Sequence, residues 1–197
     1  MTKSRSPDTY GTARTKLLDS GQELIRANSF NAVGLKEILD ACQVPKGSFY
    51  HYFDSKEAFG IAIAQHYHAA ELARARGYFG DVSKPPKDRL LAYFQDAYAQ
   101  MEQRGFSGGC LMCNLSTELG RDQDALRAEL ATHWEALVAE IAGCLTQMEL
   151  AELGLGHLPP EAAADWLLNS WSGALTRMKA TRSGAPLALF LRTVFNV

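Results

Sequence analysis

Two cysteines spaced for thiol chemistry stand in the middle of the chain, in the segment Ser107-Gly108-Gly109-Cys110-Leu111-Met112-Cys113-Asn114. Cys110 follows two glycines and opens a predicted helix, where backbone N–H groups and the helix dipole stabilise a thiolate and lower the thiol pKa. Cys113 follows one helical turn later, within reach of Cys110 as a resolving thiol. Cys110 is therefore a candidate reactive thiol. The alternative is an inert buried side chain, which is what we expect of Cys42 and Cys144.

Other chemistry at these cysteines has less support in the sequence. The CxxC spacing is not followed by a second CxxC or a His pair at zinc-finger spacing, so no metal site is expected. A cysteine enzyme with Cys110 as nucleophile and His133 as base is the least favoured alternative. The chain lacks a nucleophile elbow, a P-loop, a dinucleotide motif and an HExxH motif, and His133 is expected on a helix surface. We expect no catalytic residue and no cofactor.

A second set of chemically active side chains lies in the segment Pro45-Lys46-Gly47-Ser48-Phe49-Tyr50-His51-Tyr52-Phe53. Phe49 and Phe53 are four residues apart and can face a core, which leaves the polar side chains largely outward. Outward hydroxyl, imidazole and ammonium donors suit DNA phosphates and base edges, and Gly47 permits close approach of the backbone. The alternatives, core aromatics alone or an inert helical scaffold, do not explain an outward Tyr-His-Tyr helix.

The strings Gly34–Leu39 and Val44–Ala58 closely resemble the N-terminal signature of the TetR family of repressors. The resemblance is strong over residues 12–60 and weaker over the rest of the chain. It implies that helices one to three bind DNA, that the fourth links them to a ligand-binding domain, and that two late helices form a dimer interface. Gly34 departs from the family, which often has a Thr or Ser cap there. Carried over by position, the operator contacts would be Lys36, Lys46, Gly47, Ser48, Tyr50, His51, Tyr52 and Lys56.

Helix-period patterns dominate the chain, so we predict an all-α fold of about nine helices. A helix-turn-helix DNA-binding domain is expected over residues 1–54, and a regulatory and dimerisation domain over residues 55–197. The predicted helices are Thr12–Ala27, Leu35–Cys42, Pro45–Tyr52, a helix capped by Asp54 or Ser55 that reaches Tyr78, Asp88–Arg104, Leu111–Leu119, Asp122–Ala151, Glu161–Thr181, and a last helix from Pro186.

The chain also resembles the branch of the family that senses reactive electrophiles or oxidants through a cysteine. The matching features are the Val44–Gly60 string, the Gly109-Cys110-Leu111 element and Lys179 in a late helix. The resemblance makes Cys110 the sensor, with Cys113 beside it, and places the Lys179 ammonium near enough to favour the thiolate. Tyr98 and Trp171 are among the aromatics that could line an apolar pocket. The alternative is a reversible apolar inducer without thiol chemistry.

Charge and composition narrow the class of protein without identifying it. Residues 1–60 hold 8 Lys and Arg against 7 Asp and Glu, a net of +1, and the whole chain has a formal net charge of −2. This excludes binding of nucleic acid by bulk positive charge. No apolar run approaches the length of a membrane span, and the N-terminus is polar, so a cytoplasmic protein with reduced thiols is expected. Because one small reading module buries too little surface, we expect a homodimer on double-stranded operator DNA.

Overall fold

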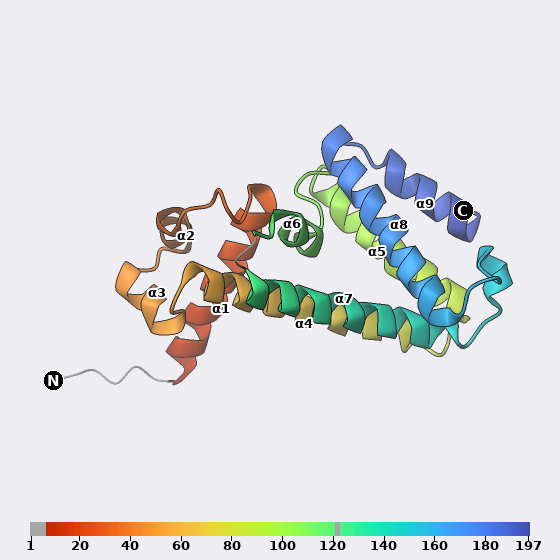
Figure 1. The fold of residues 1–197 in the computed structure, drawn as a ribbon, viewed down its shortest axis with the longest axis horizontal. Coiled ribbons are helices and arrows are strands. Elements are labelled where there is room, and N and C mark those ends of the chain that lie inside the picture. Colours follow the sequence, from red (N-terminus) through yellow and green to blue (C-terminus); the bar gives the residue numbers. More distant parts are fainter. Residues whose placement is uncertain (1–6, 121–122) are drawn as a thin grey trace.

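The computed structural model describes residues 7–120 and 123–197. Within these residues, helices joined by loops are the regular secondary structure, and there are no strands. The predicted all-α fold is therefore confirmed. Figure 1 shows a smaller N-terminal group of helices and a larger C-terminal group, with the long helices α4 and α7 running between them. The helices are α1 (Pro7–Ala27), α2 (Leu35–Cys42), α3 (Lys46–Tyr52), α4 (Lys56–Phe79), α5 (Pro86–Gln103), α6 (Leu111–Glu118), α7 (Asp124–Leu145), α8 (Pro160–Thr181) and α9 (Ala185–Phe195), with a 3₁₀ turn at Leu150–Leu153.

Local capping explains where the N-terminal helices begin and end. Gly34 precedes α2, and its N–H donates to the Glu37 carboxylate at 2.7 Å. Gln43 ends α2 in the left-handed conformation, with φ 54°, which turns the chain toward α3. The Ser55 hydroxyl oxygen accepts the Ala58 N–H at 3.0 Å and starts α4. These contacts build the expected helix-turn-helix between α2 and α3.

The N-terminal core joins α1, α2 and α3 to the first half of α4. Phe49 and Phe59 are fully buried there, and their rings pack edge to face at 5.3 Å. Three residues of α6 and two of the first turns of α7 belong to the same core: Leu111, Met112, Leu115, Leu126 and Leu130. Helices α1 and α4 are thus packed directly on α6, although α6 begins only at Leu111.

The long helices α4 and α7 lie side by side and run in the same direction (Figure 1). Gln65 donates to Glu129, and Arg76 pairs with Glu140, so the same offset of 64 residues holds along both helices. Their N-terminal ends enter the N-terminal core. Their C-terminal ends enter the second core, which α5, α8 and α9 complete. A shift of α4 or α7 is therefore felt by both cores.

The structure corrects several predicted helix boundaries. Helix α1 begins at Pro7, earlier than Thr12, and α7 ends at Leu145 instead of continuing to Ala151. The end of α7 has a local cause, because the Thr146 hydroxyl and the Gln147 amide both donate to the Gly143 carbonyl at 2.9 Å. These side chains donate hydrogen bonds to a backbone carbonyl that has no partner within the helix, because it lies in the last turn. No helix in the described part of the chain is long and apolar enough to cross a membrane.

Candidate functional site

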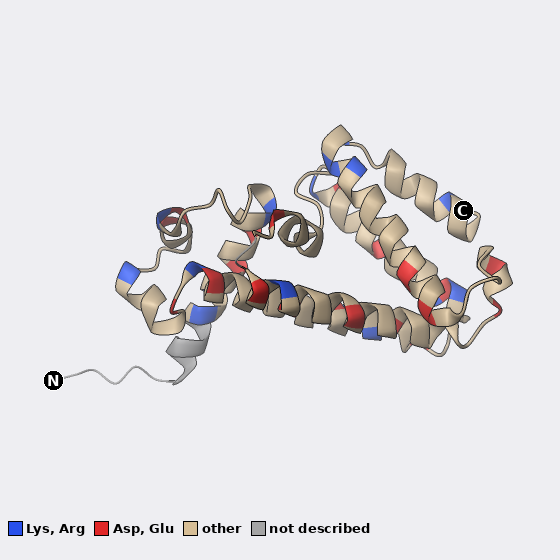
Figure 2. Cartoon of the chain, in the orientation of Figure 1, with Lys and Arg blue, Asp and Glu red and all other residues tan. Residues whose placement is uncertain are grey.

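The third helix presents polar side chains on the outer tip of the N-terminal unit. Lys46, Tyr50 and His51 are exposed, and Tyr50 keeps 52% of its surface accessible although it is a large aromatic residue. A Cβ added at Gly47 would meet no atom within 4 Å, so internal packing does not require glycine there. Figure 2 shows basic residues on α2 and α3 at this tip, and the exposed Lys36 is the one on α2. The tip can therefore approach a polyanion.

Three of the proposed DNA contacts are less outward than the sequence suggested. Ser48 and Tyr52 are half-buried, and Tyr52 packs against the N-terminal core. The reason is helical geometry, because Tyr52 lies three residues after the buried Phe49 and so flanks the inward face. Lys56 is also half-buried. Its ammonium donates to the Asn31 carbonyl at 3.4 Å and lies 4.9 Å from the Phe30 ring centroid.

The Cys110 thiol lies at the boundary between the two cores and packs against both. Cys110 is the N-cap of α6, as the sequence indicated, and its Sγ lies 3.7 Å from the Tyr67 hydroxyl on α4. Hydrogen bonds from the Cys113 side chain, then from the Cys113 backbone N–H and Tyr67, lower the pKa of Cys110 to about 7, although burial opposes them. The same thiol pair raises the pKa of Cys113. Cys110 is thus the thiolate of the pair.

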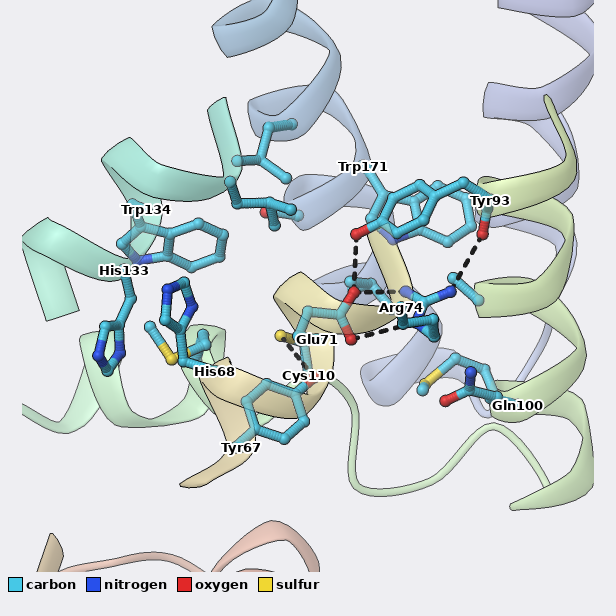
Figure 3. A pocket seen from close by; sticks show the side chains of 17 residues that line it. Tyr67, His68, Glu71, Arg74, Tyr93, Gln100, Cys110, His133, Trp134 and Trp171 are labelled. Carbon is cyan, nitrogen blue, oxygen red and sulfur yellow. Dashed lines mark hydrogen bonds and ion pairs between the residues drawn. The ribbon is translucent and has the colours of Figure 1, made fainter. Parts of the chain in front are cut away.

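A cavity of about 60 Å³ opens beside Cys110, between α4, α5, α7 and α8. Its walls are mainly aromatic and aliphatic, and Figure 3 shows Cys110, Tyr67, Trp134 and Trp171 around it. Since one water needs roughly 10–15 Å³ measured in this way, the space suits a few waters or a compact organic molecule. The thiol therefore faces a small and largely apolar chamber.

The polar part of this chamber is an ion network between α4 and α5 (Figure 3). The Glu71 carboxylate accepts from the Arg74 guanidinium and, at 2.7 Å, from the Tyr93 hydroxyl. Arg74 also donates to Asp96 at 2.7 Å, so one cation serves two carboxylates. Burial, followed by the Glu71 charge, raises the pKa of Tyr93 well above its usual value and keeps its hydroxyl a donor. Sequence reasoning missed the charged residues Glu71, Arg74 and Asp96, although the Glu71–Arg74 spacing on a predicted helix was a usable signal.

The remaining predicted sensor residues are distributed over neighbouring sites. Trp171 lines the chamber, whereas Cys113 and Lys179 line a second cavity of about 130 Å³, which Cys110 also lines. The Lys179 ammonium donates to the Asn114 side-chain oxygen at 3.1 Å. Lys179 is thus near the thiol, but the lowered thiol pKa comes from Cys113 and Tyr67. Tyr98 is not among the residues that line the chamber and packs against Phe106 instead.

His133 is buried, and the expectation of a surface position was wrong. Only 4% of its surface is accessible, its Nε2 lies 2.6 Å from Glu129, and its ring stacks on His68 at 4.0 Å. Because α7 packs along α4, the polar face of α7 that carries His133 is covered by α4. Burial lowers the pKa of both histidines, that of His68 to about 4. The hydrogen-bond partners of Cys110 are Tyr67 and Cys113, which is not the thiol–imidazole pairing of a cysteine enzyme.

Within residues 7–120 and 123–197, no group of three or more His, Cys, Asp and Glu side chains is arranged to hold a metal ion. Residues 17–63 match the family described as bacterial regulatory proteins, tetR family, and residues 86–194 match the tetracyclin repressor-like C-terminal domain. The chain belongs to the TetR family. Its fold, with the helix-turn-helix at the N-terminus and a helical C-terminal domain, is the one this membership implies.

Named relatives cover nearly all of the chain. The HTH-type transcriptional repressor NemR of Escherichia coli (strain K12) is 34% identical over 197 residues, which span 100% of this chain and 97% of NemR. DhaR of Mycobacterium sp. (strain GP1), also an HTH-type transcriptional repressor, is 34% identical over 183 residues, 93% of this chain and 90% of DhaR. A crystal structure of a regulatory protein TetR from Rhodobacter sphaeroides superposes with a TM-score of 0.87 at 33% identity, covering 93% of this chain and 97% of that one. The chain is accordingly a transcriptional repressor of the TetR family, and its named relatives are regulators, not enzymes.

Proposed function

We propose that this repressor binds operator DNA as a homodimer and is released when an electrophile or oxidant reacts with Cys110. The observation that carries the proposal is the position of Cys110, which packs against the N-terminal and the C-terminal core at once and faces the chamber. A bulky or charged group added there must displace packed side chains. Such displacement shifts the equilibrium between two states only if the modified thiol fits one state better.

The DNA-reading surface is the exposed tip of the N-terminal unit. We assign base and phosphate contacts to the exposed residues Lys36, Lys46, Gly47, Tyr50 and His51, with Ser48, Tyr52 and Lys56 at its edge. A recognition helix contacts base edges through its N-terminal residues, and here these are Lys46, Gly47 and Ser48. Two such heads, about 34–36 Å apart in a dimer, would read successive major grooves.

The homodimer is assigned to α8 and α9. Trp166 on α8 and Leu189 on α9 are large apolar side chains that keep 42% and 52% of their surface accessible. They line one groove together with small residues such as Gly173 and Ala174, which allow close approach of a second copy. An exposed apolar face of this kind is typical of an interaction surface.

The thiol chemistry is supported by the lowered pKa of Cys110, to about 7, which provides a thiolate near neutral pH. The thiolate would attack an electron-poor carbon, or a peroxide oxygen with release of water after protonation, to leave a thioether or a sulfenic acid. A solved structure of E. coli NemR, with a TM-score of 0.80 at 33% identity over 94% of this chain and 96% of that one, is described as its reduced form. The description of that structure thus specifies the redox state of E. coli NemR.

A second candidate function is release by a reversible small molecule that occupies the chamber without reacting. The apolar walls and the Glu71–Arg74 network favour this alternative.

The deciding experiment measures binding of a DNA duplex selected by the unmodified protein from a randomised library, before and after treatment with iodoacetamide or hydrogen peroxide. We expect the treated wild type to release the duplex and Cys110→Ser to retain it. Normal release of Cys110→Ser would exclude the thiol mechanism.

A further inference from the structure

Helix α6 is packed as a part of the N-terminal unit, although its N-cap residue, Cys110, faces the chamber. Leu111, Met112 and Leu115 are buried in the N-terminal core, with at most 5% of their surface accessible. Gly108, which leads into α6, contacts the last turn of α1, since an added Cβ would lie 3.0 Å from Cγ of Arg26. A rigid helix of eight residues spans about 12 Å, so α6 connects the thiol to a second contact at its far end.

The far end of α6 carries a carboxylate that is bound by the segment between α1 and α2. Glu118 Oε2 accepts the Ser29 hydroxyl at 2.7 Å and the Asn31 backbone N–H at 3.3 Å. The Glu118 backbone carbonyl also accepts the Asn31 side-chain amide at 2.9 Å. The partners are 87 and 89 residues apart in the chain, so these bonds fix α6 against the segment that leads into the helix-turn-helix.

The position of this carboxylate is unfavourable unless its partners stabilise it. A negative charge in the last turn of a helix meets the negative end of the helix dipole. Here two donors compensate it, and the Glu118 charge also acts on Lys56, whose ammonium donates to the carbonyl of Asn31. One carboxylate is thus connected to the α1–α2 segment and, through Asn31, to the first residue of α4. Among the described residues, no other α6 side chain forms a hydrogen bond with the segment between α1 and α2.

We propose that Glu118 is the positioning residue through which α6 transmits the state of Cys110 to the DNA-binding unit. A group added at Cys110 displaces the N-terminus of α6, the rigid helix carries that displacement to Glu118, and the bound Ser29–Asn31 segment moves with it. This inference rests on the proposed function. It adds a route that does not pass through a tilt of α4, and it predicts that cutting the contact at Glu118 weakens release without abolishing DNA binding.

The experiment uses the full-length protein and the duplex selected by the unmodified wild type. Iodoacetamide alkylates Cys110, with formation of an S–C bond and departure of iodide, and mass spectrometry of the digested protein confirms the modified residue. The measured quantity is the ratio of the duplex dissociation constants after and before alkylation. Glu118→Ala removes both side-chain bonds, Glu118→Gln keeps an oxygen acceptor for Ser29, and Ser29→Ala removes the partner. Glu135→Ala, which changes an exposed carboxylate on α7, is the matched control.

We expect Glu118→Ala to bind the duplex within about threefold of wild type before alkylation, and its release ratio to fall by about tenfold. Glu118→Gln should recover part of that ratio, Ser29→Ala should lose it, and Glu135→Ala should match wild type. A normal ratio in both Glu118→Ala and Ser29→Ala overturns the proposal. So does loss of duplex binding before alkylation in a folded Glu118→Ala, because Glu118 would then serve binding itself. If wild type is not released at all, the proposed thiol mechanism fails as well, and that result is distinct from the first.

Discussion

The Tyr67 hydroxyl lies 3.7 Å from Sγ of Cys110 and connects the linking helix α4 to the N-cap of α6. The Tyr67 ring is also 5.4 Å from the buried guanidinium of Arg26, at the end of α1. Three elements therefore meet at one thiol: the last turn of α1, the middle of α4 and the start of α6. A change of charge or volume at Cys110 therefore acts on the end of α1 and on α4 as well as on α6.

The first prediction concerns the pH dependence of Cys110 alkylation. Because the pKa of Cys110 is lowered to about 7, the rate constant with iodoacetamide should rise through neutral pH and level off by about pH 8. At pH 6 it should be about a tenth of that plateau. Cys144, whose pKa is raised by burial, should remain unreactive over this whole pH range. Peptide mass spectrometry at several pH values measures both. A Cys110 profile that first rises above pH 8.5 contradicts the lowered pKa.

The second prediction assigns the cause of that lowered pKa. Cys113 is the largest contributor, so Cys113→Ala should raise the pKa of Cys110 and slow alkylation at pH 7 by about tenfold. Cys113→Ser keeps a hydroxyl donor and should slow it less. Tyr67→Phe, which removes the weaker bond, should fall between wild type and Cys113→Ala. An equal rate in all four proteins would mean that the thiol pair does not control reactivity.

The third prediction concerns the free energy of unfolding. Glu71 accepts from Tyr93 and Arg74 in a site where less than a fifth of its side chain is accessible, and Glu71→Ala leaves both donors without that partner. We expect a loss of about 2 to 3 kcal/mol in urea denaturation. Glu140→Ala is the control, because its partner Arg76 is largely exposed and such pairs contribute under about 1 kcal/mol. Equal losses would show that burial of the Glu71 network adds no stability.

The helix-turn-helix could be predicted from the sequence because its determinants are local. Phe49 and Phe53 are one helical turn apart, and Ser55 caps the helix that follows, so type, spacing and turn chemistry all agree. The position of Cys110 as N-cap of α6 was predictable for the same reason, from the two glycines before it. Both inferences needed only neighbouring residues.

The contacts that connect the sites could not be predicted in this way. Tyr67 meets Cys110 across 43 residues, and Ser29 meets Glu118 across 89. Neither pair has a periodic pattern, because such contacts depend on how α4, α6 and α7 pack. His133 was misplaced for the same reason, since the burial of its ring against His68 follows from the pairing of α4 with α7. Local patterns therefore located the sites, and tertiary packing determined what connects them.

The fourth prediction tests the reading surface. Lys46→Ala should weaken binding of the selected duplex and of unrelated DNA alike, and should reduce the slope of log affinity against log salt by about one. Tyr50→Ala should weaken binding of the selected duplex more than that of unrelated DNA if its side chain reaches base edges. Lys84→Ala, on the loop between α4 and α5, is the charge-matched control. Titrations by fluorescence anisotropy at several salt concentrations measure all three.

The fifth prediction concerns the dimer. Leu189 lies on the exposed face of α9, and Leu189→Glu would place one carboxylate from each copy in an apolar interface without a partner. We expect light scattering to show monomers and the affinity for the selected duplex to fall by at least about a hundredfold, because each head must then bind alone. Val82→Glu is the control, since Val82 is also an exposed apolar residue, at 82% accessibility, but lies far along the chain in the α4–α5 loop. Leu189→Glu protein that remains dimeric and binds normally would place the interface elsewhere.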